Sequence, residues 1–263
     1  MKERGIKEEL IERVKEIYKE TISRVKVREK KGENIWLVRG VRQGCPMSPI
    51  LFNILISDLK ERLKKRGKGR ITVRGERIFS LAYADDLVLI AEEESGMRLM
   101  MAELEKYLEE KDLVLNAEKS KIMKFKKGGG KEKNQTWKWK RKNIEVVKEY
   151  KYLGVWLQKN GRLERQMQES IRKTGVTMRE VWGIGKRRFG RDWKRRLWLF
   201  DTLVWTVMGY GVELWGWNSW KRMEGMQEKF LRWLIRADWK TPGYMVKEEF
   251  KREDLRIRGL KRA

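Results

Sequence analysis

The sequence predicts an α+β fold, with short antiparallel strands and helices in its first half and mostly helices in its second. Three observations predict this class. Apolar residues recur at helical spacing in several segments, short apolar runs bounded by turn residues alternate with them as far as residue 125, and segments rich in Trp and Arg follow residue 157. A chain of 263 residues, 40% of them hydrophobic, can bury a core of this kind.

The charge balance points to a polyanionic partner. The chain has 64 Lys and Arg against 38 Asp and Glu, a net charge of +26, which favours nucleic acid as that partner. There is no histidine and one cysteine, Cys45. This excludes a histidine-dependent triad, an imidazole metal site, an internal disulfide and a cysteine zinc cluster within the chain. A metal here would be a hard cation bound by oxygen ligands.

The opening segments alternate between helix and strand. Ile6–Ile22 carries apolar residues at helical spacing and predicts an amphipathic helix. Arg24–Arg28 and Ile35–Val38 flank a polar turn and predict a hairpin. After a loop, Ser48 and Pro49 predict a helix with a serine N-cap and a proline at its first position. The apolar residues expected on one side of this single helix are Leu51, Ile54, Leu55, Leu59 and Leu63.

Three apolar runs between residues 71 and 91 predict two further hairpins. Ile71–Val73 and Arg77–Leu81 flank a glycine turn, and the second run leads through Asp85 and Asp86 into Leu87–Ala91. An apolar, acidic, apolar pattern of this length predicts a hairpin with two carboxylates at its bend.

The later segments complete the predicted organisation. Met97–Leu108 predicts a helix, Ile122–Phe125 a strand and Tyr152–Leu157 a short β segment. The lysine- and glycine-rich stretch before that segment predicts a flexible basic loop. The predicted division is a first unit over residues 1–125, a basic loop over 126–143, a β element over 144–157 and a helical region over 158–263.

Asp85 and Asp86 form the most informative local motif. Neighbouring carboxylates at the tip of an apolar hairpin repel each other and lose hydration, and a bound Mg²⁺ would compensate for both effects. Two-metal phosphoryl transfer needs ions bridged by carboxylates in this way. When the pair is viewed alone, a solvated turn that uses aspartate for its tolerance of turn geometry is the better explanation.

The pair does not stand alone, because several other blocks occur in a fixed order around it. The blocks are GVRQGCPMSPILFN at 40–53, LAYADDLVL with its YADD motif at 81–89, LNAEKSK at 115–121, YLGV at 152–155, Tyr210–Trp215 and Gln227–Phe230. In this order they resemble reverse transcriptases, most closely those of non-LTR (LINE-type) retrotransposons. The resemblance extends over nearly the whole chain.

The resemblance implies a right-hand polymerase: a palm on an antiparallel sheet, a β primer-grip element and a helical thumb. It implies an RNA-directed DNA polymerase, a nucleotidyltransferase that adds a dNTP to the primer 3′-hydroxyl. Its partners would be an RNA template with a DNA primer, or an RNA–DNA hybrid. Asp85 and Asp86 match the catalytic carboxylates that hold Mg²⁺, with Mn²⁺ as the alternative ion.

Other residues match family positions with less specific chemistry. Those that match the nucleotide and template site are Gln43, Gly44, Tyr83 and Ala84. Those that match the primer-grip turn are Tyr152, Leu153 and Gly154, and a plain strand and turn of the core is also consistent with them. Lys119 matches a lysine near the triphosphate, where it would protonate the leaving pyrophosphate. A solvated lysine is an equally good interpretation of Lys119.

The chain departs from the family pattern before Ile6–Ile22. Reverse transcriptases use a third metal-binding aspartate on an earlier strand, and the match places that strand and the fingers before Met1. We therefore expect a palm truncated at its N-terminus, with little or no polymerase activity from this chain alone, because two carboxylates hold two Mg²⁺ ions poorly. The alternative function is a catalytically inactive remnant that binds nucleic acid.

Basic residues and tryptophans supply candidate contacts to nucleic acid. The basic cluster expected to bind the phosphate backbone is Arg187, Arg188, Arg191, Lys194, Arg195 and Arg196. Trp137 and Trp139, among lysines, are the better candidates for stacking on bases. The tryptophans expected in the core because they lie in apolar periodic runs are Trp198, Trp205, Trp215 and Trp233.

A third alternative is a membrane-associated basic protein. Leu197–Trp217 is long and apolar, yet it contains Asp201, Glu213 and three glycines, which favour a buried helix over a membrane span. The N-terminus does not have the pattern of a signal peptide, so we expect a nuclear or cytoplasmic protein rather than a secreted one. The sequence does not predict the oligomeric state.

Overall fold

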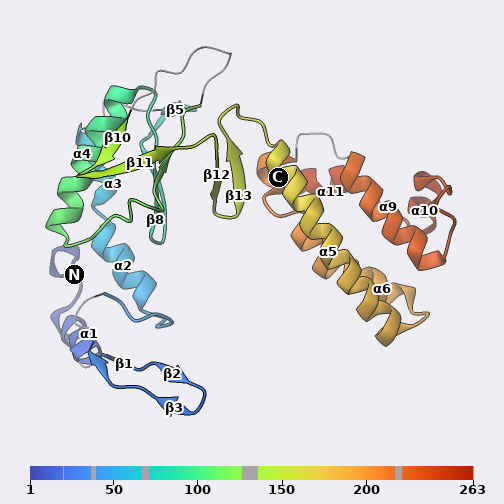
Figure 1. The fold of residues 1–263 in the computed structure, drawn as a ribbon, viewed down its shortest axis with the longest axis horizontal. Helices are drawn as coiled ribbons and strands as arrows, with labels where there is room; N and C mark the ends of the chain where they lie inside the picture. The colour runs from blue at the N-terminus through green and yellow to red at the C-terminus, as the bar shows by residue number, and fades with distance from the viewer. Residues whose placement is uncertain (20, 37–39, 67–70, 126–135, 217–220, 263) are drawn as a thin grey trace. The chain divides into compact units, whose positions relative to one another are not determined.

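The computed structural model of residues 1–263 describes every residue except 20, 37–39, 67–70, 126–135, 217–220 and 263 (Figure 1). The described residues form two compact units. The first contains Met1–Ala117 with Trp139–Arg141, and the second contains Glu118–Lys138 with Lys142–Ala263. Both contain helices and strands, which confirms the mixed helix and strand class.

The first unit combines helices with small sheets. Its helices are the 3₁₀ turn η1 (Lys2–Arg4), α1 (Glu8–Lys19), α2 (Ser48–Ile56), α3 (Leu59–Arg66) and α4 (Glu94–Glu110). Its strands are β1 (Ile22–Ser23), β2 (Lys26–Val27), β3 (Lys30–Lys31), β4 (Ile35–Trp36), β5 (Ile71–Val73), β6 (Glu76–Ile78), β7 (Ser80–Tyr83) and β8 (Asp86–Leu89). The two hairpins predicted between residues 71 and 91 are confirmed as β5 with β6 and β7 with β8, although the predicted strand Arg77–Leu81 is divided between β6 and β7. The hairpin predicted from Arg24–Arg28 and Ile35–Val38 has a different pairing, because β1 pairs with β4 and β2 pairs with β3, each antiparallel. Among the described strands these pairs are separate two-stranded sheets rather than one palm sheet.

The single helix predicted after Pro49 is two helices, α2 and α3. The helix is interrupted at Ser57 and Asp58, between the end of α2 and the start of α3. At this interruption the Ser57 hydroxyl donates to the carbonyl of Ile54 at 2.8 Å. Such a bond competes with the helix ladder, and side chains of α4 and the loop after it engage the Asp58 carboxylate. The prediction of helical structure was therefore right, and the prediction of one continuous helix was wrong.

Ser48 does not cap α2 as predicted. The N-cap is Met47, without a side-chain bond, and Ser48 begins the helix with Pro49 in its first turn. The Ser48 hydroxyl instead donates to the carbonyl of Arg42 at 2.7 Å and lies 3.0 Å from the hydroxyl of Tyr18. It thus fastens the preceding loop to α1.

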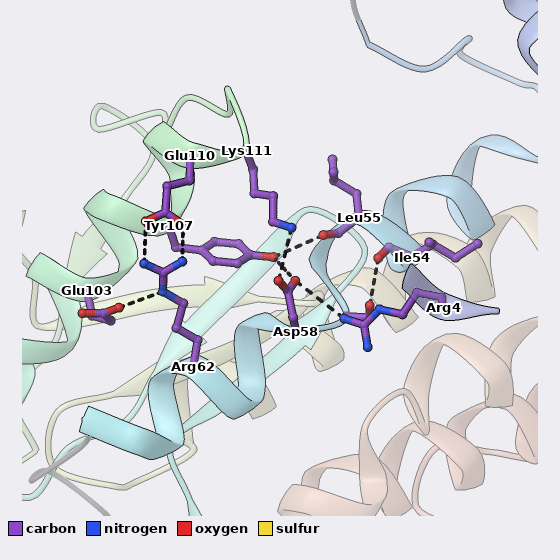
Figure 2. Close-up of polar contacts among 10 residues, drawn as sticks. Arg4, Ile54, Leu55, Asp58, Arg62, Glu103, Tyr107, Glu110 and Lys111 are labelled. Atoms are coloured by element: carbon purple, nitrogen blue, oxygen red, sulfur yellow. Dashed lines mark hydrogen bonds and ion pairs between the residues drawn. The ribbon is translucent and has the colours of Figure 1, made fainter. Parts of the chain in front are cut away.

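A buried tyrosine joins α4 to the α2–α3 break. Tyr107 is fully buried, and its hydroxyl lies 2.6 Å from Oδ1 of Asp58 and 3.2 Å from the carbonyl of Leu55. Beside it, Arg62 of α3 contacts the buried Glu103 at 2.8 Å and forms a bidentate pair with Glu110 (Figure 2). These contacts hold α3 and α4 together, since both acidic partners of the arginine lie on α4.

The contacts around Asp58 change its acidity. Burial acts to raise the pKa of this carboxyl, but hydrogen bonds from Tyr107 and Lys111 outweigh burial, and the pKa lies below its ordinary value of 3.8. Burial and the neighbouring carboxylate raise the pKa of the Tyr107 phenol, so the phenol stays protonated and can donate.

The second unit begins with strands and continues with helices. Its strands are β9 (Lys121–Ile122), β10 (Trp137–Trp139, of which Trp139 is grouped with the first unit), β11 (Lys142–Val146), β12 (Glu149–Tyr152) and β13 (Val155–Gln158). Its helices are α5 (Glu164–Phe189), α6 (Trp193–Leu199), the π-helical turn η2 (Phe200–Val204), α7 (Trp205–Met208), α8 (Val212–Trp215), α9 (Lys221–Ile235), α10 (Gly243–Glu249) and α11 (Leu255–Leu260). The strands β10, β11 and β9, in this order, form one sheet, in which β9 and β11 are parallel. The strands β12 and β13 pair in a separate antiparallel hairpin.

The apolar segment Leu197–Trp217 supplies the core of the second unit. It is divided into α6, η2, α7 and α8, and α5 packs against the first three of these elements. Its buried members are Leu199, Phe200, Val204, Trp205, Met208, Val212 and Trp215. Among the described residues, no helix has both the length and the hydrophobicity to cross a bilayer. The prediction of buried helices for this segment is confirmed.

The predictions for individual tryptophans need two corrections. Trp137 and Trp139 are 2% and 7% exposed, so they are core residues rather than free stacking surfaces. They alternate with the exposed Lys138 on β10, because a strand places every second side chain on the same face. Trp198 is 60% exposed, against its predicted burial. The burial of Trp205 and Trp215 is confirmed, and Trp233 packs partly buried against the same core.

The predicted basic loop at 126–143 also needs a boundary correction. Residues 126–135, including the three glycines at 128–130, lie outside the described residues. Within the rest of this stretch, β10 and the start of β11 occupy positions predicted as loop. The predicted β segment Tyr152–Leu157 contains the turn and parts of both strands of the β12–β13 hairpin.

We expect Tyr107→Phe to lower the free energy of unfolding by about 1 kcal/mol at pH 7, because Asp58 loses a donor to its partly exposed carboxylate. The folded-state pKa of Asp58 is lowered, so this stabilisation is present above pH 3.8 and is lost as the pH falls through the folded value. Urea unfolding followed by circular dichroism from pH 7 to pH 2.5 measures this difference. Tyr244→Phe, in a side chain that is 72% exposed, is the control. A pH-independent difference would contradict the assignment.

Candidate active site

The β7–β8 hairpin carries the acidic pair at its turn. Its register pairs Tyr83 with Asp86, so Ala84 and Asp85 are the two residues of the turn. Ala84 has a φ of 51°, in the left-handed region, where a residue with a Cβ is strained by about 1 kcal/mol. The prediction of a hairpin with both carboxylates at its bend is confirmed.

Both carboxylates and their neighbours face solvent. Asp85, Asp86 and Ala84 are exposed, and Tyr83 is 65% exposed. Exposed carboxylate oxygens are suitable ligands for a hard divalent cation such as Mg²⁺. In the part of the chain that the structure describes, no cluster of three or more His, Cys, Asp or Glu side chains could hold a metal. The donor set here is therefore a pair of carboxylates.

Gln43 and Gly44 lie in the exposed loop before α2. Gly44 has a φ of 83°, and an added Cβ would meet no atom within 4 Å, so its backbone is open to a ligand. The loop is anchored by Arg42, whose Nε donates to the hydroxyl of Thr21 at 2.8 Å and whose guanidinium lies 5.2 Å from the ring centre of Tyr18. Sequence reasoning missed these anchoring contacts, because they join residues more than twenty positions apart.

Lys119 lies in the second unit, beside the β12–β13 hairpin. Its side chain is exposed, and its backbone carbonyl accepts a hydrogen bond from the Tyr150 hydroxyl at 3.4 Å. The loop that carries Lys119 is thereby tied to the strand that leads into the predicted primer-grip turn.

The turn of the β12–β13 hairpin is built for close approach by a tyrosine. Leu153 and Gly154 have φ values of 45° and 82°, a pair of positive values that suits a two-residue hairpin turn. The Tyr210 hydroxyl donates to the carbonyl of Leu153 at 2.6 Å. A Cβ on Gly154 would lie only 3.0 Å from a ring carbon of Tyr210. The positive φ at position 154 and the closeness of the Tyr210 ring therefore each favour glycine there.

Further contacts attach the same hairpin to the helices. The backbone N–H of Trp156 donates to the side-chain oxygen of Gln166 on α5 at 2.9 Å. At the bend between α7 and α8, a Cβ on Gly211 would lie 3.1 Å from the side chain of Val155. The hairpin and the helical region thus form one packed unit. The block Tyr210–Trp215 was singled out in the sequence only as part of the family resemblance, and nothing in the pattern identified its contact with the hairpin or the role of Gln166.

The predicted backbone-binding cluster divides into two groups. Its exposed members lie at the end of α5, in the following loop and on α6: Arg187, Arg188, Arg191, Lys194 and Arg195. Arg196 is different, because it is 8% exposed and its guanidinium lies 4.0 Å from the ring centre of Trp182. The sequence pattern did not distinguish Arg196 from its exposed neighbours, and its contact with phosphate stays a prediction. Arg196 turns toward α5 on the buried side of α6.

The predicted site residues fall in both units. Gln43, Gly44 and the Tyr83–Asp86 turn belong to the first, whereas Lys119, the Tyr152–Gly154 turn and the basic cluster belong to the second. Within the second unit, the structure brings Lys119 and the Tyr152–Gly154 hairpin together.

Comparisons with known proteins agree with the motifs. The profile of the family described as reverse transcriptase (RNA-dependent DNA polymerase) matches residues 2–157, which include the loop before α2, the acidic hairpin and the β12–β13 hairpin. The chain therefore belongs to the reverse transcriptase family.

Individual relatives are retrotransposon polyproteins. The chain is 32% identical over 147 residues to a Pol polyprotein of the type-1 retrotransposable element R2 of Nasonia vitripennis, a match that covers 53% of this chain and 14% of the relative. It is 34% identical over 142 residues to the R2DM polyprotein of Drosophila melanogaster, covering 51% of this chain and 13% of the relative. An R2 polyprotein of Popillia japonica is 36% identical over 85 residues, or 32% of this chain and 14% of the relative. The matches thus span about one seventh of each relative's length.

We expect Gly154→Ala to destabilise the second unit by about 2 to 3 kcal/mol, since it combines a strained positive φ with a clash against Tyr210. Gly161→Ala is the matched control, because Gly161 has a φ of 70° but nothing within 4 Å of an added Cβ. This control should cost about 1 kcal/mol. Urea unfolding measures both changes.

The difference between the two alanine variants should shrink in a Tyr210→Ala background, where the clash is removed. Equal costs for both variants in the unaltered background would contradict the proposed contact between Gly154 and Tyr210.

Proposed function

We propose that this chain is the reverse transcriptase domain of a non-LTR retrotransposon and acts as an RNA-directed DNA polymerase. The observation that carries the proposal is the exposed Asp85–Asp86 pair on a strained hairpin turn, in a chain of the reverse transcriptase family. The similarity to R2 polyproteins supports the retrotransposon origin. We assign the first unit to the palm and the helices of the second unit to the thumb.

The proposed partners are an RNA template with a DNA primer, or an RNA–DNA hybrid, together with a dNTP. A net charge of +26 supports a polyanionic partner. The exposed arginines and lysine of α5, α6 and their connecting loop would contact the phosphates, and their exposure supports this role. Such contacts carry affinity rather than sequence information, so binding should depend steeply on salt.

Asp85 and Asp86 would hold the divalent ion, which we propose to be Mg²⁺, with Mn²⁺ as a substitute. When bound, such an ion activates the primer hydroxyl and neutralises charge on the triphosphate. The residues' own part is to present carboxylate oxygens at the two-residue turn and at the first position of β8. Tyr83 and Ala84 shape that turn next to the primer end.

Four further roles follow from the exposed loops. The Gln43 amide can donate and accept hydrogen bonds at a base or sugar edge, and Gly44 lets the backbone approach the nucleotide. The Lys119 ammonium can donate to the triphosphate and protonate the leaving pyrophosphate. The turn over Tyr152–Gly154 would position the primer strand, held in place by Tyr210.

A second candidate function is nucleic-acid binding without polymerase activity. It is favoured by the size of the donor set, since the described residues place no third metal-ligating side chain with Asp85 and Asp86. Two carboxylates hold a pair of Mg²⁺ ions less firmly than three do.

Primer extension on poly(rA) with oligo(dT) and Mg²⁺ or Mn²⁺ tests the two functions. We expect weak incorporation that falls to background in Asp85→Asn, because a neutral amide is a poor ligand for a hard cation. Glu76→Gln removes an exposed carboxylate from the neighbouring β5–β6 hairpin and should leave incorporation unchanged.

Binding of the same hybrid, followed by fluorescence anisotropy, completes the test. Both variants should bind as the unaltered chain does, with affinity falling as salt increases. Salt-sensitive binding without incorporation under either metal would reject polymerase activity for this chain and support the second candidate. Absence of both would contradict both functions.

A further inference from the structure

Arg196 is a buried cation with unused donors. Its side chain is 8% exposed, and Nη1 donates weakly to the carbonyl of Gly190 at 3.4 Å. Its Nε and Nη2 atoms are buried and have no hydrogen-bond partner among the described residues. A buried guanidinium donor without a partner lowers the stability of the folded state. Its presence therefore needs an explanation, either a bound ligand or a structural role.

The surroundings of Arg196 are shaped to receive its side chain. The guanidinium lies 4.0 Å from the ring centre of Trp182 on α5. On the same helix, a Cβ at Gly185 would lie 3.2 Å from Cγ and 3.4 Å from Nε of Arg196. The ring offers a favourable cation–π contact, and the missing side chain leaves room for the arginine. These contacts hold the arginine in place, but they satisfy neither of its free donors.

The arginine opens onto a surface pocket. The pocket has a volume of about 420 Å³, and Arg191, Arg196 and Arg236 all line it. Burial, and then the charge of Arg236, lower the pKa of the Arg196 guanidinium, so the two groups lie near enough to repel. An anion between them would remove the repulsion and compensate the charge that Arg196 carries against the cost of burial.

The rest of the lining limits what the pocket can hold. Trp193, which is 44% exposed, packs edge to face on Phe250 with ring centres 5.4 Å apart, and both rings line the pocket. One carboxylate, Glu249, also lines it, against three arginines. Residues at the C-terminal ends of α5 and α9 contribute as well, and their carbonyls favour cations. Those carbonyls explain the presence of arginines, but within the part of the chain that the structure describes none of them accepts a hydrogen bond from Nε or Nη2 of Arg196.

We propose that this pocket binds a phosphate group, with Arg196 and Arg236 as its ligands and Arg191 at its rim. A guanidinium fork matches phosphate oxygens in a bidentate fashion, which the exposed Arg191 and Arg236 can offer beside the buried charge of Arg196. The phosphate could come from a nucleic-acid backbone or from free phosphate or nucleotide. The pocket is distinct from the Asp85–Asp86 turn, and the inference does not depend on polymerase activity.

Thermal unfolding with inorganic phosphate tests the pocket directly. Phosphate at about 10 mM should raise the Tm of the unaltered chain by about 2 to 4 °C relative to sodium chloride at the same ionic strength. Arg236→Gln should lose most of this shift, because it removes a ligand from an exposed position. Arg179→Gln, an equal charge change at an exposed position of α5 outside the pocket, should keep it.

Arg196→Met adds a second readout that separates a ligand site from a purely structural arginine. Without phosphate its Tm should equal or exceed that of the unaltered chain, because an apolar side chain of similar length replaces an unsatisfied cation. With phosphate it should show no shift. A lowered Tm without phosphate, together with an unchanged phosphate shift in Arg236→Gln, would overturn the proposal.

Fluorescence anisotropy with a single-stranded oligonucleotide identifies the source of the phosphate. If a backbone phosphate occupies the pocket, Arg236→Gln should weaken binding about 10-fold and reduce the salt slope by about one. If only free phosphate occupies it, oligonucleotide affinity should stay unchanged while the thermal shift is lost. Both results support the pocket. No phosphate shift and no effect on oligonucleotide binding would reject it, whatever the outcome of primer extension.

Discussion

The main constraint on this molecule is how a chain with a net charge of +26 places its arginine side chains. Where an arginine guanidinium lies between two helices, a carboxylate or an aromatic ring contacts it. Arg62 meets the buried Glu103 and thereby joins α3 to α4. In the second unit, Asp201 in the π-helical turn accepts from Arg252, which precedes α11, and from Arg258, which lies on α11. Arg196 differs, because it stacks on an aromatic ring while two of its donors have no hydrogen-bond partner among the described residues. That difference identifies it as a candidate ligand-binding residue rather than a structural one.

Backbone geometry places the candidate functional groups at the tips of two hairpins. In the first unit, Ala84 adopts a positive φ so that two adjacent carboxylates lie at one turn. In the second unit, Gly154 adopts a positive φ that lets Tyr210 reach the turn. Both hairpins lie within the stretch that matches the reverse transcriptase family. Strain at a non-glycine residue persists only where the surrounding structure supports it, and here it coincides with the proposed metal ligands.

Much of the local structure could be predicted from the sequence, and the failures have identifiable causes. The hairpin that presents Asp85 and Asp86 was predicted because an apolar, acidic, apolar pattern of that length fits few alternatives. The break at Ser57–Asp58 was missed, since it depends on a tyrosine some fifty residues away. Trp137 and Trp139 were assigned to a loop because lysines surround them, yet they lie on the buried face of a strand. The metal-ligand roles of the two aspartates stay predictions.

The sequence by itself determined the mixed class, the basic surface, the acidic hairpin and the resemblance to reverse transcriptases, because periodicity, charge and ordered motifs are properties of neighbouring residues. Only the tertiary structure decided which members of a basic cluster face water and which are buried. Arg195 and Arg196 are adjacent in the chain, yet one is exposed and the other stacks on Trp182. The physical reason is that burial depends on the elements packed against a helix, and these come from distant parts of the chain.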